Sequence, residues 1–264
     1  MIKCRRIIFY GVIFLRILIT NDDGIQGTGL WAIAAALKNH GFEITIAAPM
    51  NQQSGTSHAL SIRREIEYKR FDSPDCEAWI FDGTPTDCVK IYLEGMNDGK
   101  KFDALISGIN DGANLATDVL YSGTVGAALE GFLHAIPSLA VSLDKNSEIP
   151  FDTAADFAVK YLEKILSIKR EPFLHNINFP KKFRADKAEF IATRLGHRDY
   201  INAFTSHTDA GRAYFVIGGT AYDVDDSDGT DIHAVNLGYV SVTPLHADAA
   251  DYEELVELRK IFRG

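Results

Sequence analysis

The sequence has few cysteines and fewer basic than acidic residues. Its three cysteines, Cys4, Cys76 and Cys88, are an odd number without metal-ligand spacing, which favours a reducing compartment over a disulfide framework. Lysine and arginine number 27 against 36 acidic residues, and the net charge of the 264-residue chain is −9. This charge disfavours a nucleic-acid partner. It also predicts that any anionic ligand is neutralised locally, as a metal ion would do.

The sequence also lacks an apolar run long enough to span a membrane. The run at residues 7–15 follows three basic residues and has the length of a signal-peptide apolar region. It has no small-residue cleavage site, and Arg16 ends it. We therefore expect residues 1–15 to be an N-terminal extension outside the fold, with secretion as the less favoured alternative. We expect a cytoplasmic protein without a membrane partner.

Two common nucleotide-binding signatures are missing as well. No G-x-G-x-x-G follows the first predicted strand, and no P-loop is present. Residues 223–229 resemble a calcium loop, but aligning Gly229 with the loop glycine puts Val224 and Val235 at the first and last ligand positions. Valine supplies no side-chain oxygen, so this stretch is not an EF-hand.

What is present is an alternation of buried strands and helices in the first two thirds of the chain. The predicted strands are 17–20, 43–48, 102–107 and 137–142, and the predicted helices are 29–39, one starting at Thr84-Pro85, and 127–134. We therefore predict an α/β fold with a Rossmann-like, mostly parallel sheet and helices on both faces, forming a catalytic domain of residues 16–169.

The pattern changes after about residue 169. Strand-like segments at 173–180, 188–194, 212–218 and 237–243 are separated by polar stretches without helices. A final helix at 251–263 places Tyr252, Leu255, Leu258 and Phe262 on one face, which must be buried on its own domain or on a partner subunit. Residues 170–264 are thus predicted to be a β-rich C-terminal extension with a terminal helix that serves oligomerisation.

The most informative stretch is the first strand with the residues that follow it. Asp22 and Asp23 come directly after the apolar run, at the end of a parallel strand where α/β sheets place ligands. Two adjacent carboxylates in a crevice repel each other, so one is protonated or a cation lies between them. Hard divalent cations prefer such oxygen ligands. The alternative is a plain Asn-Asp-Asp-Gly surface turn.

Three further segments supply groups that such a site needs. The loop at 52–56 offers the Ser54 hydroxyl and, at Gly55, a backbone amide that an anion can approach; otherwise it is a flexible surface loop. Residues 107–114 offer Asn110 and Asn114, or form a turn-rich connection. Residues 121–126 precede the third helix, where a free helix N-terminus can bind an anion; otherwise a serine or threonine there is only an N-cap.

The histidines give a weaker signal. Of the eight, only His58 has a plausible place at the site, and a structural role is favoured over a catalytic one.

Several segments are similar to one known family in their order along the chain. They are Leu18–Gly24, Ala48-Pro49 with Gln53-Ser54-Gly55, Gly83–Val89, Ser107–Asn110 with Gly112 and Asn114, Tyr121–Val125, Asn176–Pro180, Gly229–Asp231 and Tyr239–Leu245. Over about residues 16–246 the chain resembles the SurE family, the stationary-phase survival proteins that act as 5′-nucleotidases. Residues 1–15 have no counterpart in the family, and the histidine in 56–60 departs from its pattern.

The resemblance implies a set of site residues. The implied metal ligands are Asp22, Asp23, Ser54 and Asn110, and the implied phosphate contacts are Asn114 and Ser122, Gly123 and Thr124. It also implies a homodimer or homotetramer that exchanges C-terminal segments between subunits.

These expectations predict a metal-dependent phosphomonoesterase, a 5′-nucleotidase that converts nucleoside 5′-monophosphates into nucleoside and phosphate. One divalent cation per subunit, Mg²⁺ or Mn²⁺, is the predicted cofactor, and the predicted catalytic residues Asp22 and Asp23 hold it, one of them also accepting the proton of the attacking water. Two alternatives remain. One is a broader phosphatase that takes 3′-nucleotides or short polyphosphate, and the other is a non-catalytic nucleotide or metal sensor.

Overall fold

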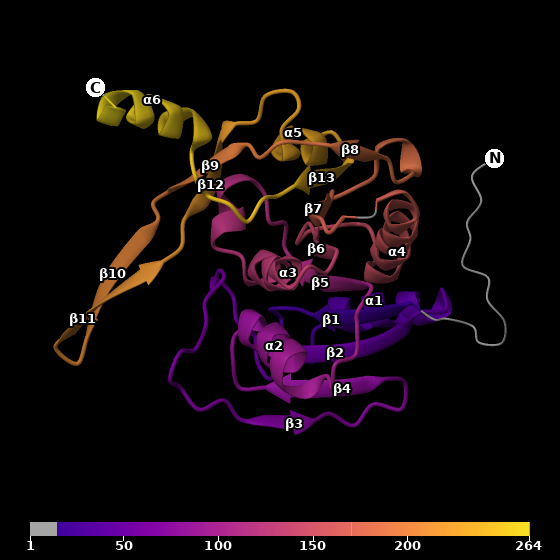
Figure 1. Cartoon of the computed structure of the whole chain (residues 1–264). Coiled ribbons are helices and arrows are strands. Elements are labelled where there is room, and N and C mark those ends of the chain that lie inside the picture. The colour runs from indigo at the N-terminus through magenta and orange to yellow at the C-terminus, as the bar shows by residue number, and fades with distance from the viewer. Residues whose placement is uncertain (1–14, 170, 264) are drawn as a thin grey trace.

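The computed structural model describes residues 15–169 and 171–263. A nine-stranded sheet forms its centre (Figure 1). The strands of this sheet are β1 Arg16–Thr20, β2 Glu43–Pro49, β3 Tyr68–Arg70, β4 Glu77–Phe81, β5 Ala104–Asp111, β6 Ser138–Leu143, β7 Leu174–Phe179, β8 Phe190–Ala192 and β13 Val240–Pro244. They lie side by side in the order β3-β4-β2-β1-β5-β6-β7-β13-β8. The six strands from β4 to β7 are parallel to one another. At the two sides, β3 pairs antiparallel with β4, and β13 pairs antiparallel with β7 and parallel with β8. The predicted α/β fold with a mostly parallel sheet is confirmed.

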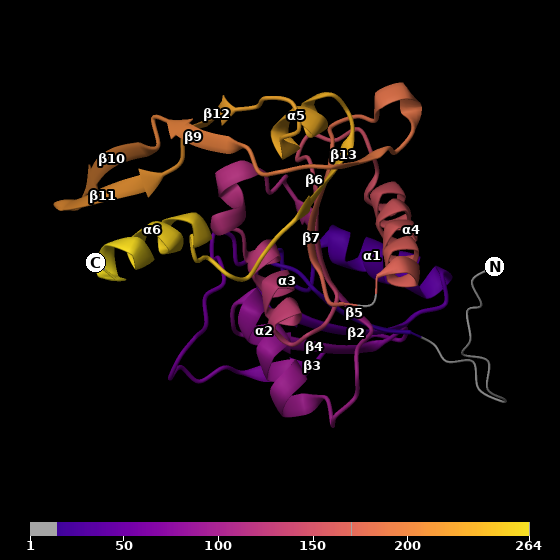
Figure 2. The same cartoon turned by 45° about the horizontal axis from the view of Figure 1, so that its top comes forward.

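Helices cover both faces of the sheet. The helices are α1 Thr28–Asn39, α2 Pro85–Ile91, α3 Gly123–Leu133, α4 Phe151–Ile168, α5 Asp231–Asn236 and α6 Tyr252–Arg263, with shorter turns η1 Tyr92–Met96, η2 Ala116–Leu120 and η3 Arg184–Asp186. Helices α1 and α4 pack together on one face, and α2 and α3 pack together on the other (Figure 2).

The alternation of side chains along β1 divides the core in two. Ile17 and Ile19 belong to the cluster beneath α1 and α4, and Leu18 belongs to the cluster beneath α2 and α3. All three are fully buried, and burying each contributes about 1.5–3 kcal/mol. This two-sided burial is the reason that β1 is continuously apolar.

The strand order of the sheet changes direction at β1. Its neighbour on one side is β2, and its neighbour on the other side is β5. In open α/β sheets this reversal leaves a crevice at the carboxyl ends of the two strands, which is the usual place for a ligand. The segments after β1 and β5 are those that the sequence analysis singled out.

Two helix starts show how local sequence sets the boundaries. Thr84 caps α2, which confirms the predicted helix start. Its Oγ1 accepts the Asp87 N–H while the Asp87 carboxylate accepts the Thr84 N–H. The predicted start of α3 at residue 127 is wrong. Ser122 caps this helix through its Oγ, which accepts the Val125 N–H at 3.2 Å, so α3 begins four residues earlier, at Gly123.

The C-terminal part joins the sheet and also leaves it. Strands β7, β13 and β8 extend the central sheet, whereas β9 His197–Ile201 with β12 Thr220–Asp225 and β10 Phe204–Asp209 with β11 Arg212–Ile217 form two separate ribbons. The β10–β11 hairpin reaches away from the sheet (Figure 1). The added antiparallel strands match the predicted β-rich extension. The division into a catalytic domain of 16–169 and an oligomerising part of 170–264 stays a prediction.

The predicted apolar face of α6 is largely uncovered within this chain. Tyr252 and Phe262 are 62% and 80% exposed, and Leu255 and Leu258 are only partly buried. The predicted N-terminal extension lies outside the described residues, apart from Leu15. Among the helices of the described part, none combines the length and the apolar character that crossing a bilayer requires.

Candidate active site

Asp22 and Asp23 lie at the carboxyl end of β1, in the crevice beside β5. Asp22 is only 5% exposed, and Asp23 is partly buried. The Asp22 backbone carbonyl accepts the Gln53 N–H at 2.7 Å, which fixes the loop after β2 beside the pair. The chain therefore places two carboxylates close together, one buried and one partly buried.

Asp22 points at the first turn of α3. Its Oδ1 accepts the Thr124 hydroxyl hydrogen at 2.5 Å. A Cβ built on Gly123 would lie 3.1 Å from the Asp22 Cβ and 3.3 Å from its Oδ2, so only glycine lets the helix approach this closely. Burial raises the pKa of Asp22 to about 6, the Thr124 hydrogen bond opposes the rise, and the charge of Asp23 adds to it.

Asp23 faces the loop after β5. Its Oδ2 accepts the Asp111 N–H at 3.3 Å. Burial raises the pKa of Asp23, the Asp111 N–H opposes this, and the charge of the Asp111 carboxylate adds to the rise. Within the described part of the chain, no lysine or arginine forms an ion pair with Asp22 or Asp23. The acidic groups thus lack a protein counter-charge, and a bound cation would supply one.

Asn110 is the last but one residue of β5, partly buried, next to the Asp111 whose N–H bonds Asp23. The β5–β6 register shifts between Ser107 and Asn110, and such a bulge re-aims the side chains that follow it. Asn110 Nδ2 donates to the Gly112 carbonyl at 2.8 Å. This bond orients the amide, and Oδ1 keeps its lone pairs for another ligand.

The loop after β2 closes the other side of the crevice. Ser54 and Gly55 are exposed in this loop, and Thr56 Oγ1 donates to the Gln53 carbonyl at 2.9 Å. Thr56 Oγ1 also lies where a Cβ on Gly123 would come within 2.8 Å of it. The structure therefore brings the predicted Ser54 loop, the Asp pair and the α3 N-terminus to one place.

The first turn of α3 is the predicted phosphate site. The backbone N–H groups of Gly123 and Thr124 have no partner within the helix, as in the first turn of any α-helix, and such groups attract anions. The Thr124 hydroxyl hydrogen is already donated to Asp22. A phosphate contact by Thr124 would therefore come from its backbone, whereas the Ser122 hydroxyl keeps its hydrogen for a ligand because it only accepts at the cap.

Asn114 has a structural role that the sequence did not show. Its N–H donates to Asn178 Oδ1 at 2.8 Å, and its carbonyl accepts from Asn176 Nδ2 at 2.8 Å. Its own Nδ2 donates to Ser142 Oγ at 2.8 Å. Asn114 thus ties the loop after β5 to β6 and β7, and its predicted phosphate contact stays a prediction.

Two site residues were not assigned from the sequence. Asp111 adds a third acidic group beside Asp23, and Thr56 lines the approach to Gly123. Asp111 carries the signal that identified the Asp pair, an acid at the end of a parallel strand. Nothing in the local sequence pointed to Thr56.

A cavity of about 600 Å³ adjoins the site. Ser122 lines both the site and this cavity, and Val125, Gly126 and Leu129 continue its wall along α3. Such a volume lies within the roughly 300–1,000 Å³ of typical ligand pockets. The site therefore offers an anion-binding turn and an adjacent apolar space.

Comparisons with known proteins agree with this arrangement. Residues 17–202 match the family model described as survival protein SurE. The chain is 42% identical to the protein named 5′-nucleotidase SurE from Pelotomaculum thermopropionicum, over 94% of this chain and 96% of that protein. It is 41% identical to the protein of the same name from a Synechococcus species, over 93% and 97% of the two chains. Among solved structures, the SurE protein from Aquifex aeolicus superposes with a TM-score of 0.78 at 35% identity, covering 93% of this chain and 99% of that one.

Proposed function

The chain belongs to the SurE family, and from this premise we propose that it hydrolyses nucleoside 5′-monophosphates to nucleoside and phosphate with the help of a divalent cation. The observation that carries the proposal is the buried Asp22 beside Asp23, without a basic partner, against the N-terminus of α3. An acidic pair alone would repel a phosphate. Joined by a cation and a helix N-terminus, it becomes a phosphate site.

The donor set fits a hard cation such as Mg²⁺ or Mn²⁺. Asp22, Asp23, Ser54 and Asn110 offer only oxygen ligands, and the raised pKa of Asp22 shows that its ionised form lacks compensation in the protein alone. When bound, the cation would neutralise phosphoryl charge and lower the pKa of a coordinated water.

The chain's own residues bind and orient the substrate. The free N–H groups of the first turn of α3 and the Ser122 hydroxyl hold the phosphoryl oxygens, where negative charge develops during in-line attack by water. Asp22 stays fixed by Thr124, whereas the more accessible Asp23 is placed to accept the proton of the attacking water. No covalent enzyme intermediate is needed, since water is the nucleophile.

A nucleotidase assay tests this proposal. Purified protein is incubated with AMP in EDTA, and then with Mg²⁺ or Mn²⁺ restored. We expect phosphate release only with the metal, and its loss in Asp22→Asn. The matched control is Asp72→Asn, which changes an exposed aspartate in the turn between β3 and β4.

The substrate panel separates the alternatives. Equal rates on 3′-nucleotides or short polyphosphate would replace the 5′-nucleotidase assignment with a broader phosphatase. Metal-dependent nucleotide binding without turnover would indicate a sensor. Full turnover in metal-stripped protein would contradict the proposed role of the acidic pair.

We also propose that the protein forms a homodimer or homotetramer through its C-terminal segments. Phe215 and Ile217 on the β10–β11 hairpin are 76% and 80% exposed, and Ile261 and Phe262 on α6 are 69% and 80% exposed. Apolar side chains of this size on protruding elements favour burial against another copy of the chain.

A further inference from the structure

We propose that the cavity beside α3 binds the nucleoside part of the substrate, and that His58 contacts this nucleoside while Glu130 holds His58 in position. The inference rests on the proposed nucleotidase function and assigns the part of the site that recognises the leaving group. The argument starts from the way in which residues 56–58 lie on α3.

The segment Thr56–His58 runs along one face of α3. Thr56 Oγ1 lies against Gly123, and a Cβ on Gly126 would come within 2.3 Å of the Ser57 carbonyl oxygen. The His58 side chain then reaches Glu130, where its Nε2 lies 2.7 Å from the Glu130 Oε2. Gly123, Gly126 and Glu130 are spaced three and four residues apart, so they share a helix face.

The residue spacing along this face of α3 gives the distance between the acidic site and His58. Seven residues separate Gly123 from Glu130, which is about 10 Å along the helix at ~1.5 Å per residue. His58 therefore lies beyond the proposed phosphate position, in the direction in which the cavity extends along α3. The cavity follows the same course, because Ser122, Val125, Gly126 and Leu129 all line it together with His58.

The lining of the cavity suits a nucleoside. Val119, Val125 and Leu174 are almost fully buried and form an apolar wall, against which a base or a ribose can pack. The phosphate of the same molecule would then lie at Ser122, the residue that the cavity shares with the acidic site. A mononucleotide has this division into a charged end and a largely apolar body.

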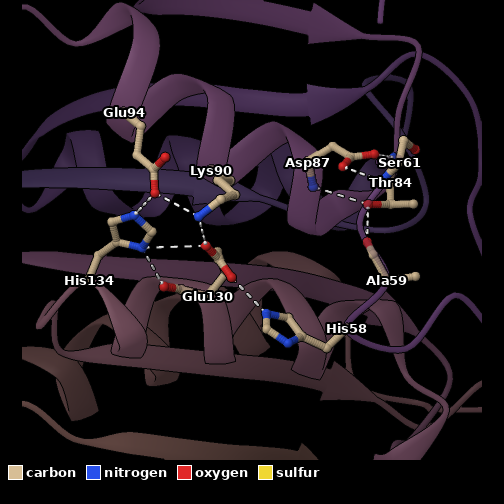
Figure 3. Close-up of polar contacts among 9 residues, drawn as sticks. All are labelled: His58, Ala59, Ser61, Thr84, Asp87, Lys90, Glu94, Glu130 and His134. Carbon is tan, nitrogen blue, oxygen red and sulfur yellow. Dashed lines mark hydrogen bonds and ion pairs between the residues drawn. The ribbon is translucent and has the colours of Figure 1, made fainter. Parts of the chain in front are cut away.

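Glu130 fixes the tautomer and orientation of His58. The Glu130 side chain is almost fully buried, and burial opposes its charge, but the hydrogen bonds from His58 and Lys90 outweigh burial and lower its pKa. An ionised Glu130 accepts the His58 Nε2–H. In the neutral imidazole, Nδ1, which is turned away from Glu130 in Figure 3, then keeps a lone pair. Such an atom accepts a hydrogen from a ribose hydroxyl or a base amino group.

The charged side chains around Glu130 form a cluster that could be mistaken for a second metal site. Glu94, Glu130 and His134 lie close enough together to share a cation. However, Lys90 Nζ lies 2.6 Å from Glu94 and 3.3 Å from Glu130, so the cluster already contains its positive charge (Figure 3). We therefore assign Glu130 and Lys90 to the positioning of His58.

The two reaction products distinguish the nucleoside pocket from the phosphate site. In His58→Ala we expect KM for AMP and the inhibition constant of adenosine to rise about tenfold, the effect of losing one good hydrogen bond. The inhibition constant of inorganic phosphate should stay within about twofold, since phosphate binds at α3. Glu130→Gln should raise the inhibition constant of adenosine as well. If a ribose hydroxyl is the donor to His58, wild type and His58→Ala should have equal KM values for 2′,3′-dideoxy-AMP.

Two controls keep the test decisive. His40→Ala removes a histidine that bonds Asp156 and Glu163 of α4, on the face of the sheet opposite to α3, and it should leave all constants unchanged. Leu195→Trp fills the cavity from a partly exposed position, and it should weaken adenosine binding but not phosphate inhibition, with thermal unfolding reporting intact folding.

The outcomes also separate this proposal from the proposed function. If the protein hydrolyses no nucleotide, the function is wrong, and titration calorimetry with adenosine still tests the pocket by comparing wild type with His58→Ala. Equal adenosine affinity in those two proteins overturns the proposal. A parallel rise of the adenosine and phosphate constants also overturns it, because His58 would then act at the reaction centre or on the fold.

Discussion

Replacing Asp22 by asparagine should make the metal-free protein more stable while it abolishes the response to metal. Asp22 has a pKa of about 6 in the folded protein against an ordinary value of 3.8. At ~1.36 kcal/mol per unit, the ionised carboxylate costs about 3 kcal/mol at pH 8. Asparagine can still accept the Thr124 hydrogen bond, and the stronger bond to the ionised carboxylate is already included in the pKa of about 6. The net gain is therefore about 3 kcal/mol at pH 8.

The dependence on pH follows from the direction of the pKa change. A carboxyl whose pKa is raised on folding contributes its full stability below its unfolded pKa, and that stability is lost as the pH rises through the folded pKa. The advantage of Asp22→Asn should accordingly grow between about pH 4 and pH 6 and level off at higher pH. Metal reverses the order at about one thousand times its Kd, where binding stabilises the wild type by about 4.1 kcal/mol.

Urea unfolding followed by far-UV circular dichroism measures these differences, in EDTA and in saturating Mg²⁺ or Mn²⁺. Asp72→Asn serves as the control and should match the wild type in both media. A plain turn aspartate makes the opposite prediction: a modest loss of stability in EDTA and an unchanged metal response. Either result for Asp22→Asn would refute the reading of this pair as a cation site.

Three other changes test separate parts of the structure. Gly123→Ala should lower kcat for AMP at least tenfold, because the added methyl meets the Asp22 Cβ at 3.1 Å. The control Gly95→Ala has open space around it and should leave kcat unchanged. Equal kcat values for the two variants would contradict the close approach of α3 to Asp22. Burial lowers the pKa of His175 to about 4, so the free energy of unfolding should fall by roughly 3 kcal/mol between pH 6.5 and pH 4 as the unfolded chain alone gains a proton. If the urea midpoint of a His175→Gln variant falls by the same amount between pH 6.5 and pH 4, a group other than His175 causes the loss of stability. Deleting residues 247–264 should reduce the association state in light scattering, and an unchanged mass would remove α6 from the interface.

Much of the central fold could be predicted because its signals are local. Ile17, Leu18 and Ile19 are apolar in succession, as a strand buried on both faces requires. Thr84 and Asp87 form a capping box within four residues, so the start of α2 could be read directly. The parallel pairing of the strands follows from the alternation of strands and helices.

The start of α3 was missed because tertiary contacts override local propensity there. Gly123 and Gly126 are poor helix formers, and the sequence therefore placed them in a loop. In the structure the absence of side chains lets Asp22 and the Ser57 backbone lie against the helix. The missing side chains of Gly123 and Gly126 thus lower the helix propensity of this turn and also allow the close contacts of the site. Helix propensity therefore failed to predict the start of α3.

The pairings that define the site also exceed what a single sequence can show. The Thr124–Asp22 hydrogen bond joins residues 102 positions apart, and the His58–Glu130 bond joins residues 72 positions apart. Each residue alone has an ordinary explanation as a cap, a turn or a helix residue. Only the fold shows that α3 receives a carboxylate at its first turn and a histidine two turns later, so that one helix orders the acidic site and the adjoining cavity along a single line.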